Sequence, residues 1–289
     1  MATTELNLEY LKSHVGHRLV ATDVVTEAPA NLLRLAFGRS EPELGPGDTL
    51  PPGWHILYFL PRLGPTDLRL DGTASEAGII PPMPLPRRMF AGERFAFHRP
   101  IRIGDAVRRE TELADVAIKQ GSTGTLVFAT TLSRIFTSEG LALEEERRTV
   151  FREEIQAGAR NAAPRREEVP ADAAWHRRIT PDPILLFRFS ALTFNSHRIH
   201  YDHRWATEVE GYPGLVVHGP LTSTLLIDFA RDSQPGRTMT GYTTQARAPL
   251  FDTAPFELRG RPAADGRAAE LWAVTPEGTV AMSARAEFR

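Results

Sequence analysis

Residues 218–229 read His-Gly-Pro-Leu-Thr-Ser-Thr-Leu-Leu-Ile-Asp-Phe. The apolar side chains from Leu221 to Phe229 predict a buried helix, with His-Gly-Pro immediately before it. Stretches rich in β-forming residues follow and predict strands at 239–249, 254–261, 268–275 and 279–288. A helix followed by a run of antiparallel strands is typical of the α+β class.

The first half of the chain has its elements in the same order. A strand-like stretch at 18–26 and a helical stretch at 30–37 precede a Pro- and Gly-rich region at 41–86, which the apolar residues 54–60 interrupt. Long β runs follow at 89–98, 106–118, 125–136 and 142–151. No repeat is visible at the level of single residues. We therefore expect an α+β double hot dog, in which two antiparallel sheets each wrap a central helix.

The clearest break in composition runs from Ile155 to Ala174. This stretch contains Gly, Pro and charged residues with little apolar periodicity, which is typical of a linker. It predicts an N-terminal hot dog at 1–155, a linker at 156–174 and a C-terminal hot dog at 175–289.

Composition excludes several functional classes. The chain has 289 residues, a formal net charge of −2 and no cysteine. We therefore expect no nucleic-acid partner, and thiolate nucleophiles, disulfides and Cys-type metal sites are excluded. No apolar run approaches the roughly 20 residues that span a bilayer, and Met1 to Tyr10 do not resemble a signal peptide, so a cytoplasmic protein without a membrane partner is expected. The usual nucleotide-phosphate, dinucleotide, HExxH and GxSxG motifs are also absent.

Three of the nine histidines, His197, His200 and His203, fall within seven residues. On a helix their spacing of three would spread them over roughly 120° of the surface, which suits a shared zinc ion poorly. No nearby Glu supplies a water-activating base, so no metal is expected. Taken singly, each is more simply a surface or packing residue. Together with Asn195 and the Gly at the helix start, they favour a functional site.

This segment resembles the motif of R-specific enoyl-CoA hydratases in the MaoC-like, double hot-dog family, Asp-x-Asn-Pro-hydrophobic-His-x-Asp with a later His-Gly at the central helix. The positions that align with it are Asn195, His197, Arg198, Ile199, His200 and Asp202, then His218 and Gly219. Residues 192–202 are similar to the branch containing mesaconyl-C4-CoA hydratases, itaconyl-CoA hydratases and type 2 hydroxyacyl-thioester dehydratases. Residues 54–61 and 84–89 also resemble that branch, so the likeness covers nearly the whole chain.

The resemblance implies that His200 is the catalytic acid/base, a role suited to a side chain with an ordinary pKa near 6.5. Gly219 either offers its backbone N–H to the thioester oxygen, where the helix dipole would help, or serves helix packing. Asn195 stands where the family has Asp and, as an amide, cannot deprotonate water. We expect Asn195 to hold the water through its side-chain oxygen while His200 transfers the proton. Asp202 either orients His200 or caps a following helix.

A dicarboxylic acyl-CoA requires a cation for its free carboxylate, and arginine suits this role. Arg198, Arg87 and Arg88 are the candidates, although CoA phosphates could use the same residues. His197 and His218 complete the residues expected to contact substrate. Tyr201 is expected to pack and His203 to lie on the surface. No cofactor is implied.

The expected function is that of a hydro-lyase acting on an α,β-unsaturated acyl-CoA, with itaconyl-CoA or mesaconyl-C4-CoA giving citramalyl-CoA. The N-terminal half would then shape the acyl pocket. A hot-dog thioesterase is the nearest rival, but Asn195 does not supply the base it needs. A non-catalytic acyl-CoA binding module and, more distantly, a metal-dependent hydrolase also compete with this function. Because hot-dog units commonly pair and a double hot dog pairs internally, a monomer and a homodimer are both consistent with the sequence.

Overall fold

A computed structural model describes residues 7–74, 78–121, 124–153 and 167–289. Its strands are β1 (Arg18–Val24), β2 (Arg87–Phe97), β3 (Ala106–Gly121), β4 (Gly124–Thr137), β5 (Gly140–Arg152), β6 (Trp175–Ile179), β7 (Met239–Ala246), β8 (Phe256–Pro262), β9 (Ala268–Val274) and β10 (Val280–Phe288). Its α-helices are α1 (Leu8–Lys12), α2 (Glu27–Ala36), α3 (Pro183–Leu192) and α4 (Gly219–Ser233). Short helical turns are η1 (Trp54–Leu57), η2 (Pro65–Asp67), η3 (Arg198–His200) and η4 (Trp205–Val209). No helix in these described ranges is long and apolar enough to cross a membrane.

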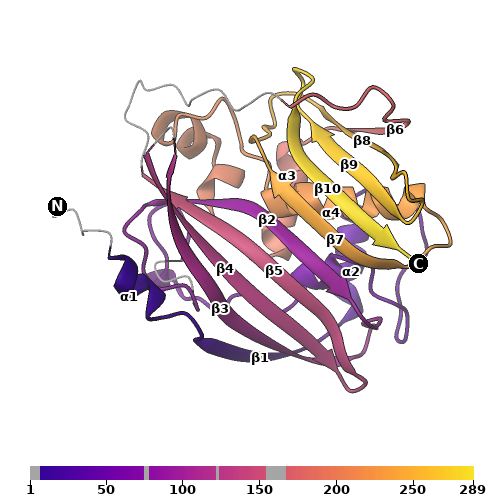
Figure 1. The fold of residues 1–289 in the computed structure, drawn as a ribbon, viewed down its shortest axis with the longest axis horizontal. Helices are drawn as coiled ribbons and strands as arrows, with labels where there is room; N and C mark the ends of the chain where they lie inside the picture. The colour runs from indigo at the N-terminus through magenta and orange to yellow at the C-terminus, as the bar shows by residue number, and fades with distance from the viewer. Residues whose placement is uncertain (1–6, 75–77, 122–123, 154–166) are drawn as a thin grey trace.

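The strands of the described ranges form a single antiparallel sheet in the order β1-β3-β4-β5-β2-β7-β10-β9-β8-β6 (Figure 1). The order is symmetric about its centre, because β1 to β5 correspond in turn to β6 to β10. The two halves join edge to edge where β2 pairs with β7, with Glu93 opposite Thr244. This pairing fuses the two expected sheets into one and leaves neither half with an open inner edge.

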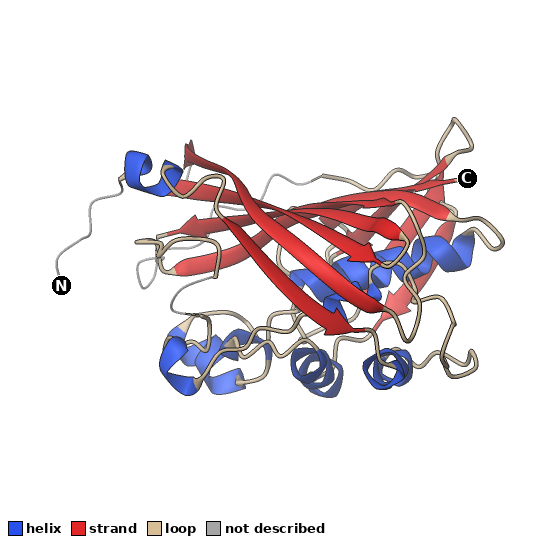
Figure 2. Cartoon of the chain, turned by 90° about the horizontal axis from the view of Figure 1, so that it is seen from below, coloured by secondary structure: helices blue, strands red, loops and turns tan. Residues whose placement is uncertain are grey.

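The helices α2, α3 and α4 lie on one side of the sheet (Figure 2). All residues of α4 from Leu221 to Ala230 are buried, which explains why its apolar residues are not confined to one stripe. Asp182 caps α3 by accepting a hydrogen bond from the N–H of Leu185 at 2.8 Å. Residues 182–193, whose apolar pattern suited a strand or a helix, are therefore mainly helical.

The expectation of a central helix in each half holds only for the second half. Isolated bridges pair Val216 with Phe251 just before α4 and Thr49 with Arg102 just before η1. These matching bridges identify η1 as the counterpart of α4, reduced to a single short turn. Two prolines, at positions 51 and 52, stand where α4 begins with the His-Gly pair. The predicted helix at 30–37 is present as α2, but its counterpart by position in the chain is α3.

The predicted linker lies partly outside the described residues, from 156 to 166. Its remainder is packed against the C-terminal sheet. Glu168 bridges to Thr279, and Val169 and Ala173 contact an apolar cluster that includes Trp272. This part of the segment is therefore packed against the C-terminal half.

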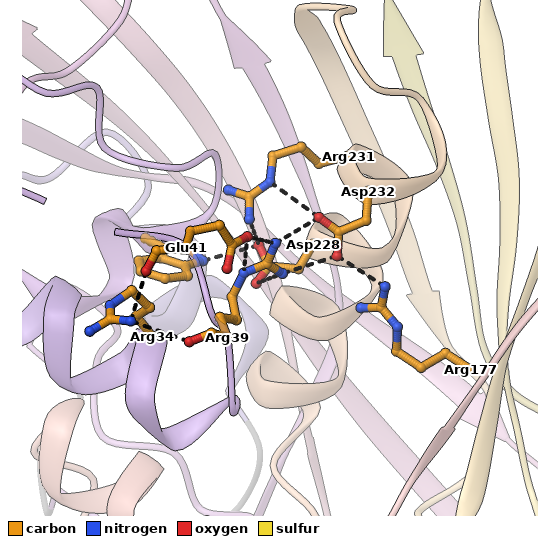
Figure 3. Close-up of polar contacts among 8 residues, drawn as sticks. Arg34, Arg39, Glu41, Arg177, Asp228, Arg231 and Asp232 are labelled. Carbon is orange, nitrogen blue, oxygen red and sulfur yellow. Dashed lines mark hydrogen bonds and ion pairs between the residues drawn. The ribbon is translucent and has the colours of Figure 1, made fainter. Parts of the chain in front are cut away.

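A cluster of charged side chains ties the two halves together near the C-terminal end of α4 (Figure 3). Arg39, which follows α2, forms ion pairs with Asp228 at 3.2 Å and Asp232 at 2.7 Å. Arg177 of β6 contacts Asp232 at 3.0 Å, and the Trp54 indole donates to Asp228 at 3.2 Å. Because Asp228 is only 1% exposed, these partners balance a carboxylate that burial alone would strongly disfavour.

Candidate active site

A cavity of about 4040 Å³ is lined by residues of both halves. Ordinary small-molecule pockets measure about 300–1,000 Å³, so this space accommodates a far larger ligand. Its lining includes η1 and inward-facing residues of β3, β4 and β5. It therefore opens where the N-terminal half lacks a long central helix. Asn195, His197, His200 and Gly219 line the same cavity.

His200 presents a neutral base to this cavity. Its Nδ1 lies 2.7 Å from the carbonyl oxygen of Val216. Because a carbonyl only accepts, Nδ1 carries the ring proton and Nε2 keeps a free lone pair. Burial, reinforced by the neighbouring His197, lowers the pKa of His200 to about 3. The ring is thus uncharged at pH 7, and its tautomer is set by the backbone.

The ring of His218 packs against the ring of His200. The two rings are stacked, with centroids 3.7 Å apart and planes 19° from parallel. His218 is fully buried, its Nε2 lies 2.8 Å from the hydroxyl of Ser190 in α3, and burial lowers its pKa well below the usual value. His218 is not one of the described residues that line the cavity. We therefore assign it a positioning role in place of the substrate contact expected from the sequence.

Asn195 and His197 form the other side of the site. The side-chain oxygen of Asn195 accepts the backbone N–H of His197 at 3.0 Å, which folds the chain into a tight turn. His197 meets the His200 ring edge to face at 5.4 Å, and burial lowers its pKa to about 4. The Asn195 oxygen, expected to hold the water, is thus engaged by the backbone. The oxygen keeps a second lone pair and the amide Nδ2 makes no hydrogen bond to another described residue, so both groups are able to contact water.

Gly219 is the first residue of α4, where backbone N–H groups have no partner within the helix. A Cβ at this position would lie 2.7–2.9 Å from three carbons of Phe90, including that residue's own Cβ. Both roles expected of this glycine are therefore compatible with the structure. The small residue lets β2 approach the helix, and Gly219 also lines the cavity.

Arg198 is engaged elsewhere. Its guanidinium pairs with Asp202 at 2.7 Å and lies over the Trp205 ring, 4.0 Å from its centre. In the described part of the chain, Arg198 is not among the cavity-lining residues. Asp202 also accepts the N–H of Trp205 at 3.0 Å, so it caps η4, while Val216 orients His200. The structure thus selects the capping role for Asp202 and gives Arg198 a structural role in place of the expected clamp.

The remaining arginine candidates, Arg87 and Arg88, do line the cavity. Arg87 is 3.6 Å from the Glu210 carboxylate and lies over the Tyr212 ring. The Arg88 guanidinium has no hydrogen bond or ion pair within 4 Å to any other described residue. The side chain is exposed to the cavity, yet desolvation by the surrounding protein, together with the nearby guanidiniums of Arg147 and Arg69, lowers the pKa of Arg88.

A loop of the first half, which no sequence pattern connected with the site, holds the catalytic segment. The backbone N–H of Arg198 donates to the Asp71 carbonyl at 2.8 Å, and the Ser196 hydroxyl donates to the Gly72 carbonyl at 2.6 Å. A Cβ on Gly72, whose φ is +81°, would lie 1.8 Å from the Ser196 carbonyl oxygen. The Asp-Gly pair at 71–72 is a recognisable turn signal, but nothing in the sequence indicates what the turn contacts.

The other residues of the motif lie at the periphery. Tyr201 is 44% exposed and donates to the Ser196 carbonyl at 3.0 Å, so the expectation that it packs was wrong. His203 is exposed, as expected. Within the described ranges, no group of three or more His, Asp or Glu residues is arranged to hold a metal ion.

Comparison with known proteins gives this arrangement a family. Residues 53–252 match the model of the family described as hydroxyacyl-thioester dehydratase type 2, which covers more than half of the chain. The chain belongs to this family. Membership in the hydroxyacyl-thioester dehydratases confirms the expected hydro-lyase class, and the match spans both η1 and the His200 segment.

Individual relatives agree with this family. The mesaconyl-C(4)-CoA hydratase of Chloroflexus aurantiacus is 49% identical over 240 residues, which cover 83% of this chain and 84% of that protein. A solved MaoC-like dehydratase superposes with a TM-score of 0.68 at 15% identity, covering 96% of this chain and 99% of that one. A Mycobacterium tuberculosis protein described as a double hot dog superposes with a TM-score of 0.57 at 15% identity, covering 95% and 96% of the two chains. These likenesses confirm the double hot-dog fold.

Proposed function

We propose that this hydro-lyase adds water to an α,β-unsaturated dicarboxylic acyl-CoA, with mesaconyl-C4-CoA giving citramalyl-CoA. The observation that carries the proposal is the neutral His200, whose Nδ1 is held by the Val216 carbonyl and whose Nε2 is left as a base in the large cavity. The 49% identity to a mesaconyl-C(4)-CoA hydratase supports the choice of substrate.

In the proposed reaction His200 moves a single proton. Its Nε2 takes a proton from water as the water oxygen bonds to the β carbon, and the π electrons move to the thioester oxygen. The N–H of Gly219 donates to that oxygen, where the N-terminus of α4 favours negative charge. The protonated Nε2 then returns its proton to the α carbon, which restores the thioester and the neutral imidazole.

Asn195 positions the water in this scheme. Its oxygen already accepts a backbone N–H, whereas the amide Nδ2 has no partner among the described residues; in this scheme Nδ2 donates to the water oxygen and turns the water's own hydrogen toward the base. This arrangement needs one base where the general family pattern has two. It accounts for an amide at a position the family fills with a carboxylic acid.

Itaconyl-CoA is the second candidate substrate. Its double bond is β,γ to the thioester, so hydration to citramalyl-CoA delivers the proton to a terminal carbon and builds no charge on the thioester oxygen. The placement of Gly219 at the cavity favours mesaconyl-C4-CoA, since only that reaction uses an oxyanion site.

The test follows mesaconyl-C4-CoA and crotonyl-CoA by loss of enoyl-thioester absorbance, for the native enzyme and for His200→Ala. Hydration of itaconyl-CoA, whose double bond is not conjugated with the thioester, is followed by chromatography of the citramalyl-CoA formed. We expect turnover of mesaconyl-C4-CoA and a loss in His200→Ala of about a hundred- to ten-thousandfold in kcat, the usual contribution of a positioned acid/base. An unaffected His200→Ala variant would contradict the mechanism. Binding of the thioesters without turnover would identify an acyl-CoA binding module, and release of free CoA would identify a thioesterase.

A further inference from the structure

The inner face of the N-terminal sheet is polar where the C-terminal sheet is apolar. Inward positions of β10 carry Met282, Ala284 and Ala286, which belong to the core around α4. The matching strand β5 presents Glu145, Arg147 and Thr149 to the cavity. Apolar residues would have sufficed to pack a helix, so this face is built to meet a polar ligand.

Arg147 lies at the centre of this polar face and is already balanced. It forms ion pairs with Glu93 at 3.0 Å and Glu145 at 2.9 Å. Glu93 in turn accepts the Ser223 hydroxyl of α4 at 2.6 Å, and Glu145 lies 3.3 Å from the His55 Nε2. The network fixes the Arg147 guanidinium against the second turn of α4, close to the catalytic end of that helix.

Arg88 lies on β2, the strand that also carries Glu93 of this network, and it lines the same cavity. Desolvation and the charges of Arg147 and Arg69 lower the pKa of Arg88, and the charge of Asp71 raises it. The charge of Arg88 in turn disfavours protonation of His197. Arg88 has no ion pair within 4 Å to any residue in the described ranges. A guanidinium that has no ion-pair partner and lies near other arginines creates a positive potential that favours binding of an anion.

We infer that Arg88, which lines the cavity without an ion-pair partner among the described residues, forms the subsite that binds the free carboxylate of the acyl chain; this inference rests on the proposed function. In mesaconyl-C4-CoA the carboxylate is attached to the β carbon, the atom that water attacks. Arg88, His197 and His200 line the same cavity, and His197 contacts the His200 ring, so an anion bound at Arg88 shares the cavity with the base. The CoA phosphates are separated from the thioester by the whole pantetheine arm, so a carboxylate is the anion that reaches this place.

The test is Arg88→Gln, with Arg94→Gln as the matched control. Arg94 is on the same strand β2 and is exposed like Arg88, but it lies outside the cavity lining. Arg147 is unsuitable as the test position, because its removal would leave two buried carboxylates uncompensated. The thermal midpoints of both variants are compared with the native enzyme to establish that they are folded.

Two ligand pairs isolate the carboxylate. For turnover, mesaconyl-C4-CoA is compared with 3-methylcrotonyl-CoA, in which a methyl group replaces the carboxylate. For binding, the dissociation constants of citramalyl-CoA and 3-hydroxy-3-methylbutyryl-CoA are measured by calorimetry. The binding arm does not depend on catalysis, so the subsite is tested even if the proposed hydration fails.

We expect Arg88→Gln to weaken kcat/KM for mesaconyl-C4-CoA and affinity for citramalyl-CoA by about 100-fold, the usual scale for a charge pair that the bound ligand shields from water. The methyl analogues should change by less than about threefold, and Arg94→Gln should change neither pair. Equal losses for carboxylate and methyl ligands would overturn the inference. A loss that disappears with 3′-dephospho-CoA thioesters would assign Arg88 to the CoA phosphate instead.

Discussion

At the scale of single residues, burial sets the chemistry of the histidines. His200, His197 and His218 all have their pKa values lowered, chiefly because burial disfavours the charged imidazolium. A neutral His200 is ready to accept a proton from water without first losing one. The stacked His218 and the Val216 carbonyl hold the ring in place, so no reorganisation is required at the moment of reaction.

The pH dependence of the reaction follows from this environment. A pKa lowered to about 3 means that His200 stays neutral far below the usual histidine range, and protonation removes the base only at lower pH. We expect kcat/KM to be flat from pH 8 to about pH 5, whereas an ordinary histidine would give a tenfold loss per unit below about 6.5. Rates are measured across this range, with circular dichroism to establish that the protein stays folded. An inflection near pH 6.5 would contradict this account.

At the scale of elements, the contrast between α4 and η1 separates the two halves. In the half with a complete helix, the segment proposed to be catalytic lies near the N-terminus of that helix, and the half with one short turn contributes much of the cavity lining. The close approach of α4 to β2 depends on Gly219, because Phe90 occupies the space that a side chain would need. Small residues at such crossings set the distance between a helix and its sheet.

Gly219→Ala tests whether this close approach matters for catalysis. Alanine keeps the backbone N–H, but its Cβ would collide with Phe90 and displace the start of the helix. We expect kcat to fall at least tenfold, since misplaced oxyanion donors typically cost more than that. The double variant Gly219→Ala/Phe90→Ala relieves the collision and should recover activity relative to the single variant. A Gly219→Ala enzyme of full activity would leave the glycine with a packing role alone.

At the scale of the whole molecule, the fused sheet and the buried ion cluster make one unit of the two halves. The β2–β7 pairing joins them at the sheet, and Arg39 joins them at the far end of α4 (Figure 3). Asp228 is buried with a pKa raised to about 6, chiefly by burial, which Arg231 and Arg39 oppose. Its ionised form at pH 7 depends on these arginines for compensation.

A double-mutant cycle measures this connection. Arg39→Met leaves Asp228 buried with less compensation, and we expect the free energy of unfolding to fall by about 3 kcal/mol. Asp228→Asn keeps an acceptor for the Trp54 indole and removes the charge, so Arg39→Met/Asp228→Asn should lose less than the sum of the single variants. The free energies of unfolding of the native protein, the two single variants and the double variant are measured by urea unfolding. Additive losses would mean that the two side chains are not energetically coupled.

The order of elements and the α+β class could be predicted from the sequence, and the sequence also indicated which segment to propose as the carrier of the chemistry. These are local properties: strands followed from alternating β-forming runs, α4 from the apolar residues 221–229, and the catalytic segment from the resemblance of residues 192–202. The division into domains at 155 and 175 stays a prediction, as does the role of each site residue. Only the tertiary structure separated Arg88 from Arg198, because the two guanidiniums differ in what lies beside them in space. The same holds for the truncated η1, the loop at Asp71 and Gly72, and the neutral state of His200, since burial and contacts between distant residues decide each of them.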